Sequence, residues 1–335
     1  MKSKHCLVTG GAGFIGSHLA ERLLDRGDRV SVIDDESTGS VKNLAEALKN
    51  PRFHYTKGTV ADRQLVRDMV AEVDEVYHLA AAVGVELIAR SPIHTIETNI
   101  YPTELILSEL SRRHEAGESV KCFLASTSEV YGKNPKASWD EDDDLVFGST
   151  SRARWSYGAS KAIDEFLALA YWREQRLPVV IGRFFNVVGP RQSAAYGMVL
   201  PRFVEAALLG RTLTVHDDGR QTRCFAHVAD VIDTVLELVT VPEALGGVFN
   251  IGSDQPVCIL DLANQVIARI DPTLSVEFVS YSAAYSDDFE DCRHRVPKLD
   301  RLNKVVKHRC RFSLDETIRA VIAHKRAELG LDRNS

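Results

Sequence analysis

The sequence has no surplus of positive charge, no closely spaced cysteines and no long apolar run, and each absence excludes a class of protein. Its 335 residues include 41 Lys and Arg against 47 Asp and Glu, a formal net charge of −6. Without a basic surplus or a basic stripe, the electrostatic footprint that nucleic acids and anionic membranes require is missing. We therefore expect a small molecule or a second copy of the chain as the partner, and neither nucleic acid nor membrane.

The six cysteines lie far apart, and no C-x-x-C pair occurs among them. This spacing argues against a zinc site and a disulfide framework and favours a reducing cytoplasm. The 11 histidines show no H-E-x-x-H motif and no other paired ligand spacing, so no metal is expected. The N-terminal residues run directly into a glycine-rich turn, which leaves no apolar core for an export signal. Because no later apolar stretch reaches membrane length, secretion and membrane spanning are not expected.

The length and the composition fit a globular protein with more than one unit. Hydrophobic residues make up 44% and charged residues 26%, close to average soluble usage, which excludes collagen-like, disordered and disulfide-scaffold classes. A chain of 335 residues predicts two domains, or one large α/β domain with a smaller companion.

Short β-branched runs alternate with amphipathic segments of helical length through the first half, a pattern typical of a parallel sheet covered by helices on both faces. The expected strands are His5–Thr9, Arg29–Asp34, Phe53–Lys57, Glu75–Leu79, Val120–Ser126 and Pro178–Arg183. The expected helices are Gly13–Asp25, Ala61–Ala71, Ile93–Arg112 and Tyr157–Gln175, and later Leu200–Leu209, Ala229–Val239, Leu260–Ile270 and Ser313–Ala327. We interpret the looser second half as a smaller domain that caps the first.

An acidic run occupies positions 140–144, where the sequence reads D-E-D-D-D. Such a run can form a ligand cluster, but like-charge runs are usually solvated loops. We expect a solvated loop here.

A glycine-rich turn follows the first expected strand and opens the first expected helix. Residues 8–16 read V-T-G-G-A-G-F-I-G, in which Gly11, Gly13 and Gly16 match the dinucleotide-binding fingerprint. Glycines permit a tight turn and close backbone approach to a pyrophosphate, which the helix N-terminus attracts. Asp34 ends the second expected strand, where a carboxylate accepts both ribose hydroxyls and repels a 2′-phosphate, so NAD is favoured over NADP. Asp35 and Glu36, the next two residues, either assist the discrimination between NAD and NADP or are solvated loop charges.

A tyrosine and a lysine four residues apart open the helix expected at 157–175. Tyr157 and Lys161 lie on one helical face, within reach of a shared ligand. An ammonium group near the phenol lowers its pKa, so that a tyrosinate can act as a base toward a sugar or alcohol hydroxyl near neutral pH. Thr127 lies just past a strand, at the carboxyl end of the sheet, and its hydroxyl can bond the same oxygen.

The motifs T-G-G-x-G-x-x-G, a serine/threonine loop and Y-x-x-x-K occur in this order. With them the chain resembles the extended short-chain dehydrogenase/reductase superfamily, in particular its nucleotide-sugar epimerases, dehydratases and decarboxylases. The resemblance covers nearly the whole chain and implies an α/β fold, a Rossmann-type doubly wound parallel sheet with a smaller α/β substrate-binding domain. It implies an NAD-binding domain at residues 1–184 with a returning segment at about 224–252, and a nucleotide-sugar-binding domain at residues 185–223 and 253–335.

The resemblance also implies the residues of two ligand sites. Segments 183–191, 200–203 and 219–225 look like those that hold the nucleotide diphosphate in these enzymes, which implies a UDP-sugar or a similar substrate, and guanidinium groups suit its phosphate oxygens. The residues expected to bind NAD are Gly10, Gly13, Phe14, Ile15, Gly16, Asp34, Val60, Leu79, Tyr157 and Lys161. The residues expected to bind the nucleotide sugar are Ser128, Asn186, Arg191, Leu200, Arg202, Arg223 and Arg295.

Three local matches favour decarboxylation within this superfamily. Residues 127–132, T-S-E-V-Y-G, look like the corresponding segment of UDP-glucuronate decarboxylases. Residues 288–297 are similar to the D-x-x-H-R-x-P segment in the decarboxylase domain of the bacterial aminoarabinose-pathway enzyme, whose arginine at the place of Arg295 is implicated in decarboxylation. Segments 139–142 and 154–157 look like the loop before that enzyme's tyrosine. The catalytic residues implied are Thr127, Glu129, Tyr157, Lys161 and Arg295.

Two activities stay open from the sequence. In NAD-dependent decarboxylation of UDP-glucuronate, Tyr157 takes the 4-hydroxyl proton as the C4 hydride passes to NAD⁺. The 4-keto group then accepts the electrons left by CO₂, giving UDP-xylose or a UDP-4-keto-pentose. In a 4-epimerase of a UDP-sugar or UDP-glucuronate, the keto-sugar rotates and hydride returns to its opposite face. Glu129 and Arg295 favour the decarboxylase, and the intact Tyr157/Lys161 pair disfavours a non-catalytic nucleotide sensor.

Two regions depart from the family's pattern. Thr59 stands where many relatives have an adenine-binding aspartate, so the backbone of residues 59–60 is expected to serve instead. A leucine and an isoleucine at 87–88 stand where relatives carry a tyrosine near the sugar, and Glu86 and Arg90 either replace that contact or face solvent.

Apolar stripes run along the expected helices Ile93–Arg112 and Tyr157–Gln175. The equivalent helices of relatives pair into a dimer bundle, so the resemblance implies a homodimer. The alternative is that the stripes pack only within one chain.

Overall fold

The computed structural model describes residues 3–82, 91–195, 198–281, 292–307 and 310–331. Outside the described residues lie Glu86, Leu87, Ile88 and Arg90 and the first part of the 288–297 segment. Both interpretations of Glu86 and Arg90 therefore stay open.

Seven parallel strands form the main sheet, in the order β11-β6-β5-β4-β1-β2-β3. They are β1 (His5–Thr9), β2 (Arg29–Asp34), β3 (Phe53–Lys57), β4 (Glu75–His78), β5 (Lys121–Thr127), β6 (Val179–Phe184) and β11 (Val248–Ile251). The predicted parallel sheet is confirmed, and the predicted strands differ from these by at most one residue at either end. The strand order reverses between β1 and β4, and open α/β sheets bind ligands outside the carboxyl ends of their strands at such a point.

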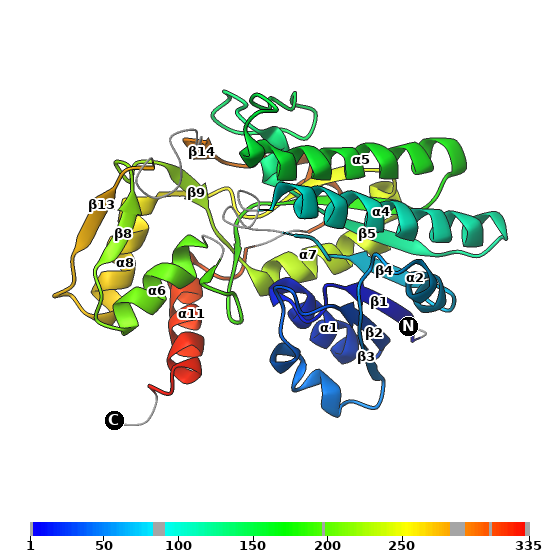
Figure 1. Ribbon diagram of the computed structural model, residues 1–335, viewed down its shortest axis with the longest axis horizontal. Helices are drawn as coiled ribbons and strands as arrows, with labels where there is room; N and C mark the ends of the chain where they lie inside the picture. Colours follow the sequence, from blue (N-terminus) through cyan, green and yellow to red (C-terminus); the bar gives the residue numbers. More distant parts are fainter. Residues whose placement is uncertain (1–2, 83–90, 196–197, 282–291, 308–309, 332–335) are drawn as a thin grey trace.

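Helices cover both faces of this sheet (Figure 1). On one face lie α1 (Phe14–Arg26) and α7 (Val228–Thr240), and on the other α2 (Arg63–Val70), α4 (Pro92–Glu115) and α5 (Ser156–Gln175). Successive strand residues point to opposite faces, so Cys6 and Val8 pack with α1 while Leu7 packs with Leu105 of α4. This burial on both sides explains the nearly continuous apolar runs of the strands.

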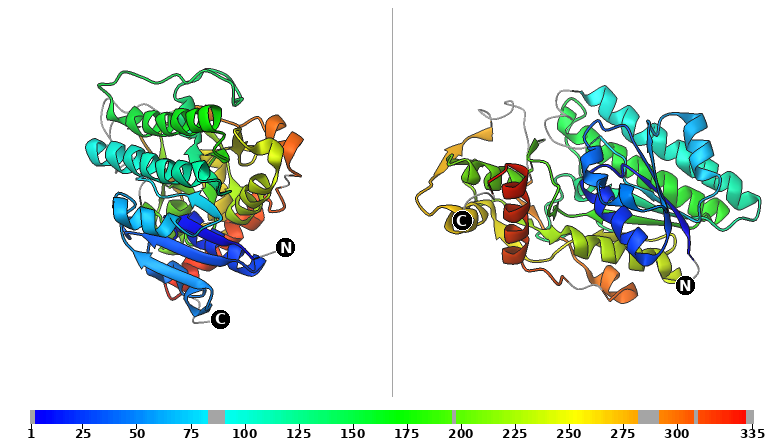
Figure 2. Two further views of the ribbon diagram at one scale, coloured as in Figure 1. Left: turned by 90° about the vertical axis from the view of Figure 1, so that its right-hand side faces the viewer. Right: turned by 90° about the horizontal axis from the view of Figure 1, so that it is seen from below.

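A smaller group of elements lies to one side of the main sheet, and Figure 2 shows its helix α11 (red) apart from α1 (blue). Its helices are α6 (Val199–Leu208), α8 (Ile259–Ile270) and α11 (Leu314–Glu328). Three small sheets pair β7 (Val187–Val188) with β10 (Ala226–His227), β8 (Leu213–His216) with β13 (Val276–Val279), and β12 (Pro256–Cys258) with β9 (Thr222–Cys224) and β14 (His294–Arg295). The sequence did not predict these short strands.

The remaining helices are short. Within the described part of the chain they are α10 (Asp300–Val305), η1 (Val41–Leu44), η2 (Ala47–Lys49), η3 (Ser128–Tyr131), η4 (Ala153–Trp155) and η6 (Pro242–Ala244). Among the described residues, no helix combines the length and the apolar character needed to cross a membrane.

The chain passes between the two groups more than once. After β6 it enters α6, β8 and β9, then returns with α7 and β11, where Asn250 lies opposite Arg183 of β6. From β11 it leaves again into β12 and α8. The domain boundaries predicted from the sequence stay a prediction.

The acidic run at 140–144 is only partly a solvated loop. Glu141 is buried, and its Oε1 accepts a hydrogen bond from the backbone N–H of Asn250 at 2.8 Å. Asp143 pairs with Lys136. The expectation of a solvated run is therefore wrong for Glu141, because β11 offers its carboxylate a buried partner that no local pattern revealed.

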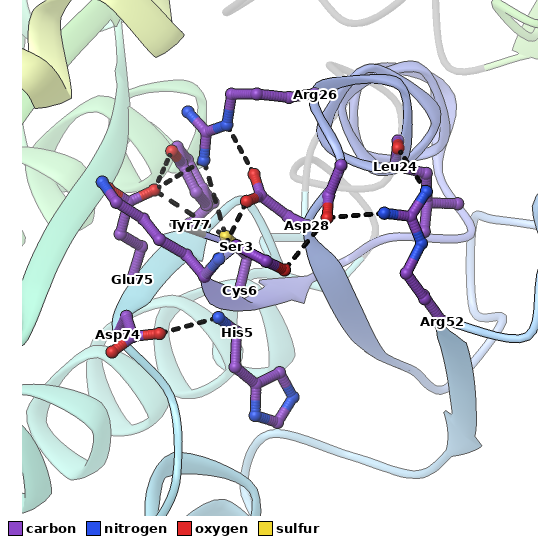
Figure 3. A network of polar contacts seen from close by, with 12 residues as sticks. Ser3, His5, Cys6, Leu24, Arg26, Asp28, Arg52, Asp74, Glu75 and Tyr77 are labelled. Carbon is purple, nitrogen blue, oxygen red and sulfur yellow. Dashed lines mark hydrogen bonds and ion pairs between the residues drawn. The ribbon is translucent and has the colours of Figure 1, made fainter. Parts of the chain in front are cut away.

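A polar network lies at the amino ends of the strands, opposite the carboxyl ends (Figure 3). The buried Glu75 of β4 accepts hydrogen bonds from the Tyr77 hydroxyl at 2.8 Å and from Arg26 Nη2 at 3.0 Å, and pairs with Lys4. Arg26 also pairs with the buried Asp28. Burial by itself raises the pKa of Glu75, but hydrogen bonds from Lys4 and Tyr77 outweigh it, and the pKa is lowered. One carboxylate thus connects β1, β4 and α1.

We expect Glu75→Gln to lower the free energy of unfolding at pH 7 by about 2 kcal/mol, because it leaves the partly buried Arg26 and Lys4 and the buried Tyr77 hydroxyl without their charged acceptor. A lowered pKa means that the ionised form stabilises the fold above the ordinary carboxyl pKa and that this contribution disappears as the pH falls through the lowered value. Urea unfolding at pH 7 and in acid measures both effects. The exposed Glu72→Gln is the control, and an equal change in both variants contradicts the expectation.

Candidate active site

A cavity of about 490 Å³ runs along the carboxyl ends of the main-sheet strands and extends to the smaller group. Its volume lies in the range of small-molecule and cofactor sites. Of the residues predicted from the sequence, the cavity is lined by Gly10, Gly13, Phe14, Ile15, Gly16, Asp34, Val60, Leu79, Thr127, Ser128, Glu129, Tyr157, Asn186, Leu200, Arg202, Arg223 and Arg295. Lys161 and Arg191 are not among the lining residues.

The glycine-rich turn joins β1 to α1 with no room for side chains at two positions. Gly10 has φ +68°, and a Cβ there would lie 2.8 Å from the backbone nitrogen of Ala80. A Cβ on Gly16 would lie 2.2 Å from the carbonyl oxygen of Gly10. The turn therefore packs against α1 at backbone distance and exposes the start of this helix to the cavity, a cradle that fits the pyrophosphate of a dinucleotide.

Asp34 lies at the end of β2 and holds the glycine-rich turn in place. Its carboxylate accepts hydrogen bonds from the N–H of Ala12 at 2.9 Å and of Glu36 at 2.7 Å. Burial raises the pKa of Asp34, and these two amide hydrogen bonds oppose the rise. Asp35 also lines the cavity, whereas Glu36 pairs with Tyr55 at 2.9 Å and Lys57 at 3.1 Å. Asp34 and Asp35 are thus the carboxylates placed to meet a ribose.

The catalytic hydroxyls lie where β5 ends and α5 begins. The Thr127 side chain accepts a hydrogen bond from the N–H of Glu129 at 3.2 Å and begins the η3 turn. The Tyr157 phenol, near the start of α5, shares a side-chain hydrogen bond with Thr127. Gly158 allows this approach, because a Cβ there would lie 2.5 Å from the Glu129 carbonyl oxygen. The structure therefore brings Thr127, Glu129 and Tyr157 together.

In this structure the pKa of the Tyr157 phenol is raised, and Lys161 is not among the groups that shift it. Burial and the nearby Glu129 charge raise the pKa of the phenol, and the Thr127 hydrogen bond opposes this only in part. The Lys161 ammonium binds Asp164 at 2.8 Å, with both side chains buried. Asp164, three residues along the same helix, therefore pairs with the ammonium group, and the role of Lys161 beside Tyr157 stays a prediction.

Glu129 lies between two arginines that come from distant parts of the chain. Its Oε1 accepts a hydrogen bond from Arg295 Nη1 of β14 at 2.6 Å, and its Oε2 pairs with Arg154 of η4. Burial by itself raises the pKa of Glu129, but Arg154 and Arg295 outweigh it and hold the pKa well below its usual range. The cluster of Glu129, Arg154 and Arg295, here called the charge cluster, therefore carries one net positive charge beside Tyr157.

Sequence reasoning placed Arg154 in a family-like loop but missed its role in the charge cluster. The available signal was its position three residues before Tyr157, which sets it at the turn into α5. His216 and Tyr281 were also missed, and both line the cavity together with Gln221 of the predicted 219–225 segment. The His216 and Tyr281 rings stack with centroids 5.8 Å apart, and His216 Nε2 lies 3.1 Å from Arg202 Nη1.

Arg191 lies against α1, away from the cavity. Its Nη2 binds the Glu21 carboxylate at 2.7 and 2.9 Å. The expectation that Arg191 contacts a diphosphate therefore differs from the structure, because the loop after β7 has φ +69° at this residue and its guanidinium meets α1. Arg202 and Arg223 remain as the lining arginines at the far end.

The sequence profile described as GDP-mannose 4,6 dehydratase matches residues 7–319. The chain belongs to this family. It is 36% identical over 320 residues to a UDP-N-acetyl-alpha-D-glucosaminuronate decarboxylase of Bacillus cytotoxicus, covering 95% of this chain and 97% of the relative. It is 33% identical to UDP-glucuronic acid decarboxylase 1 of Arabidopsis thaliana, covering 96% of this chain and 70% of the relative.

Solved structures of the same fold come from epimerases and dehydratases. A UDP-glucuronic acid 4-epimerase from Bacillus cereus, in complex with UDP-glucuronic acid and NAD, matches with a TM-score of 0.86 at 25% identity, covering 97% of this chain and 99% of that one. A dTDP-glucose 4,6-dehydratase from Streptomyces venezuelae with NAD bound matches with a TM-score of 0.85 at 28% identity, covering 98% of both chains. The Rossmann-type fold predicted from the sequence is confirmed, and the protein is an enzyme of this family.

We expect Asp34→Asn to weaken NAD binding about tenfold, because a neutral amide loses charge-assisted hydrogen bonds to ribose hydroxyls. The same change weakens the repulsion of a 2′-phosphate, so the NAD-to-NADP affinity ratio falls. Calorimetric titration with both nucleotides measures this. The control is Glu36→Gln, because Glu36 is not among the cavity-lining residues and pairs with Tyr55 and Lys57, and equal losses in both variants contradict a specific role for Asp34.

Proposed function

We propose that this enzyme removes CO₂ from a UDP-hexuronate, with UDP-glucuronate as its substrate and UDP-xylose or a UDP-4-keto-pentose as its product. The observation that carries the proposal is the charge cluster of Glu129, Arg154 and Arg295 beside Tyr157. The relatives named as decarboxylases, at 29–36% identity, support the same reaction class.

The charge cluster suits a substrate that carries a carboxylate near its reacting carbon. Its three charged side chains are largely buried, so the net positive charge is only weakly screened by water. A C6 carboxylate would supply the second negative charge and make the cluster neutral. A neutral hexose offers these two guanidinium groups no charge to meet, so the charge cluster favours an acidic sugar.

The cofactor is NAD, which when bound supplies the oxidation at C4 of the sugar and its later reversal. Tyr157 is placed to take the O4 proton, and Thr127 shares a hydrogen bond with the Tyr157 phenol. After oxidation the C4 ketone is β to the carboxylate, so CO₂ leaves as the ketone oxygen becomes an oxyanion. Thr127 and Tyr157 then stabilise this oxygen by donating hydrogen bonds.

Glu129 is ionised between its two arginines, so it has no proton to donate. We therefore assign it the orientation of Arg154 and Arg295, which in turn hold the substrate carboxylate. Removing the Glu129 carboxylate from water costs free energy, and its pairing with the two guanidinium groups offsets that cost.

Incubation with UDP-[6-¹³C]glucuronate tests the reaction. We expect release of labelled CO₂ and a UDP-pentose or UDP-4-keto-pentose in the product NMR spectrum. The alternative, a 4-epimerase of a UDP-sugar or UDP-glucuronate, gives a product inverted at C4 with its carboxylate retained. That product without CO₂ would reject the proposal in favour of the epimerase.

We expect Arg154→Met to lower kcat/KM for CO₂ release about 100-fold. The change removes a charge that the substrate carboxylate meets, and it leaves Glu129 with one arginine partner instead of two. Stopped-flow detection of CO₂ with UDP-glucuronate measures this. Arg152→Met, in the same loop and not among the cavity-lining residues, is the control. A loss in R152M equal to that in R154M would show that the loop, not the charge, matters.

We also propose that the enzyme is a homodimer through α4 and α5. Large apolar side chains are exposed on these helices, with Ile93 72%, Phe166 66% and Ile163 49% exposed. Exposed apolar patches of this kind mark protein interfaces. The cytoplasmic location stays a prediction.

We expect Phe166→Glu to shift the molar mass in light scattering from that of two chains to that of one, because a charge is then buried in the interface. Phe278→Glu on β13, where the phenylalanine is 55% exposed, is the control and should leave the mass unchanged. A wild-type mass equal to one chain contradicts the dimer.

A further inference from the structure

Asn250 is a completely buried amide that joins three separate segments of the chain. It lies in β11, at the edge of the main sheet, and none of the motifs found in the sequence includes it. Its Oδ1 accepts a hydrogen bond from the Tyr131 hydroxyl at 2.7 Å. Its Nδ2 donates to the carbonyl oxygens of Trp139 at 2.9 Å and Lys298 at 3.2 Å. Two carbonyl acceptors and one hydroxyl donor fix the orientation of this amide.

One of these hydrogen bonds holds the turn that carries Glu129. Tyr131 is the last residue of η3, two residues after Glu129, and its ring is fully buried against Trp139 with centroids 4.9 Å apart. The guanidinium of Arg183, which lies opposite Asn250 in β6, stacks over the same ring at 4.7 Å. The end of the Glu129 turn is therefore fixed relative to the edge of the main sheet.

The other two hydrogen bonds hold the segment that carries Arg295. Trp139 donates its backbone N–H to the carbonyl of Val296 at 2.8 Å, and Lys298 donates its N–H to the carbonyl of Trp139 at 2.8 Å. Trp139 and Pro297 thus form a parallel bridge immediately after Arg295. Glu141 strengthens the attachment, because it accepts a hydrogen bond from the backbone N–H of Asn250.

We propose that Asn250 is a positioning residue that sets the geometry of the ion pair between Glu129 and Arg295. Neither side of this pair is held by its own local structure alone, since η3 is a single turn and β14 has two residues. Asn250 contacts the continuation of both. A displacement of even 1 Å in such a pair is enough to impair catalysis, so the amide acts on the reaction without touching the substrate.

The test compares Asn250→Asp with Asn134→Asp. Asn134 is a buried amide in the loop that carries Trp139, and its side-chain hydrogen bonds to described residues stay within that loop. Its Nδ2 donates to the carbonyl of Asp144, and its Oδ1 accepts from the N–H of Lys136. In N250D the carboxylate cannot donate to Trp139 or Lys298, so we expect kcat for CO₂ release to fall at least tenfold. In N134D we expect a change of less than twofold. Equal losses in the two variants overturn the proposal.

A double-mutant cycle separates positioning from a general loss of structure. In the Glu129→Gln background the charged pair no longer exists, so N250D should cost less than threefold in kcat there. The same fold loss in both backgrounds means that Asn250 stabilises the fold only and overturns the proposal. Tyr131→Phe, which removes one hydroxyl and keeps the ring, provides the same cycle if N250D does not fold, with an expected loss of three- to tenfold.

The proposal rests on the proposed function only for its kinetic readout. Crystal structures of N250D or Y131F beside N134D show the ion pair directly, and we expect the contact between Glu129 Oε1 and Arg295 Nη1 to be lost in the first two variants only. An unchanged contact overturns the positioning role whatever reaction the enzyme catalyses. Wild-type enzyme that releases no CO₂ rejects the proposed function instead, and the structural comparison still decides the role of Asn250.

Discussion

The ionised carboxylate of Glu129 connects three segments that are distant in the sequence. One is the turn after β5, the second is the turn before α5 that carries Arg154, and the third is β14 with Arg295. Two guanidinium groups so close to each other repel unless an anion lies between them. The carboxylate therefore makes it possible to bring both cations to one side of the cavity, next to the Tyr157 hydroxyl.

The two ends of the main sheet have different tasks. At the amino ends, Glu75 and Asp28 are paired with Lys4 and Arg26, so that two carboxylates meet two cations. At the carboxyl ends, the polar groups of Thr127 and the charge cluster face the cavity. A rigid base of this kind allows the loops at the other end to carry function, since the sheet between them does not have to adjust.

The strands β1 to β6 and the glycine-rich turn were predictable because their signals are local, whereas β11 of the main sheet was not predicted. Period, β-branched composition and the spacing of Gly11, Gly13 and Gly16 depend on neighbouring residues only. The ion pair between Lys161 and Asp164 was also predictable, because the two residues lie at i and i+3 on the same helix. It was not predicted because Lys161 was assigned to Tyr157 instead.

Arg154, His216 and Tyr281 could not be assigned in this way. Arg154 acquires its role only because β5 and α5 meet, and the His216–Tyr281 stack requires β8 and the chain after β13 to lie side by side. The buried state of Glu141 depends likewise on β11, more than 100 residues later. Contacts between such distant positions produce no periodic pattern in one sequence, so the residues can be identified from the sequence but their contact partners cannot.

β11 is synthesised long after β6, the strand that it pairs with at the edge of the main sheet. β6 emerges from the ribosome with one side unpaired, and it stays so until α6, β8, β9 and α7 have been synthesised and β11 follows. An apolar strand with an open edge is a site for pairing with other nascent chains. The order of the elements therefore leaves this edge of β6 open while residues 185–247 are being synthesised.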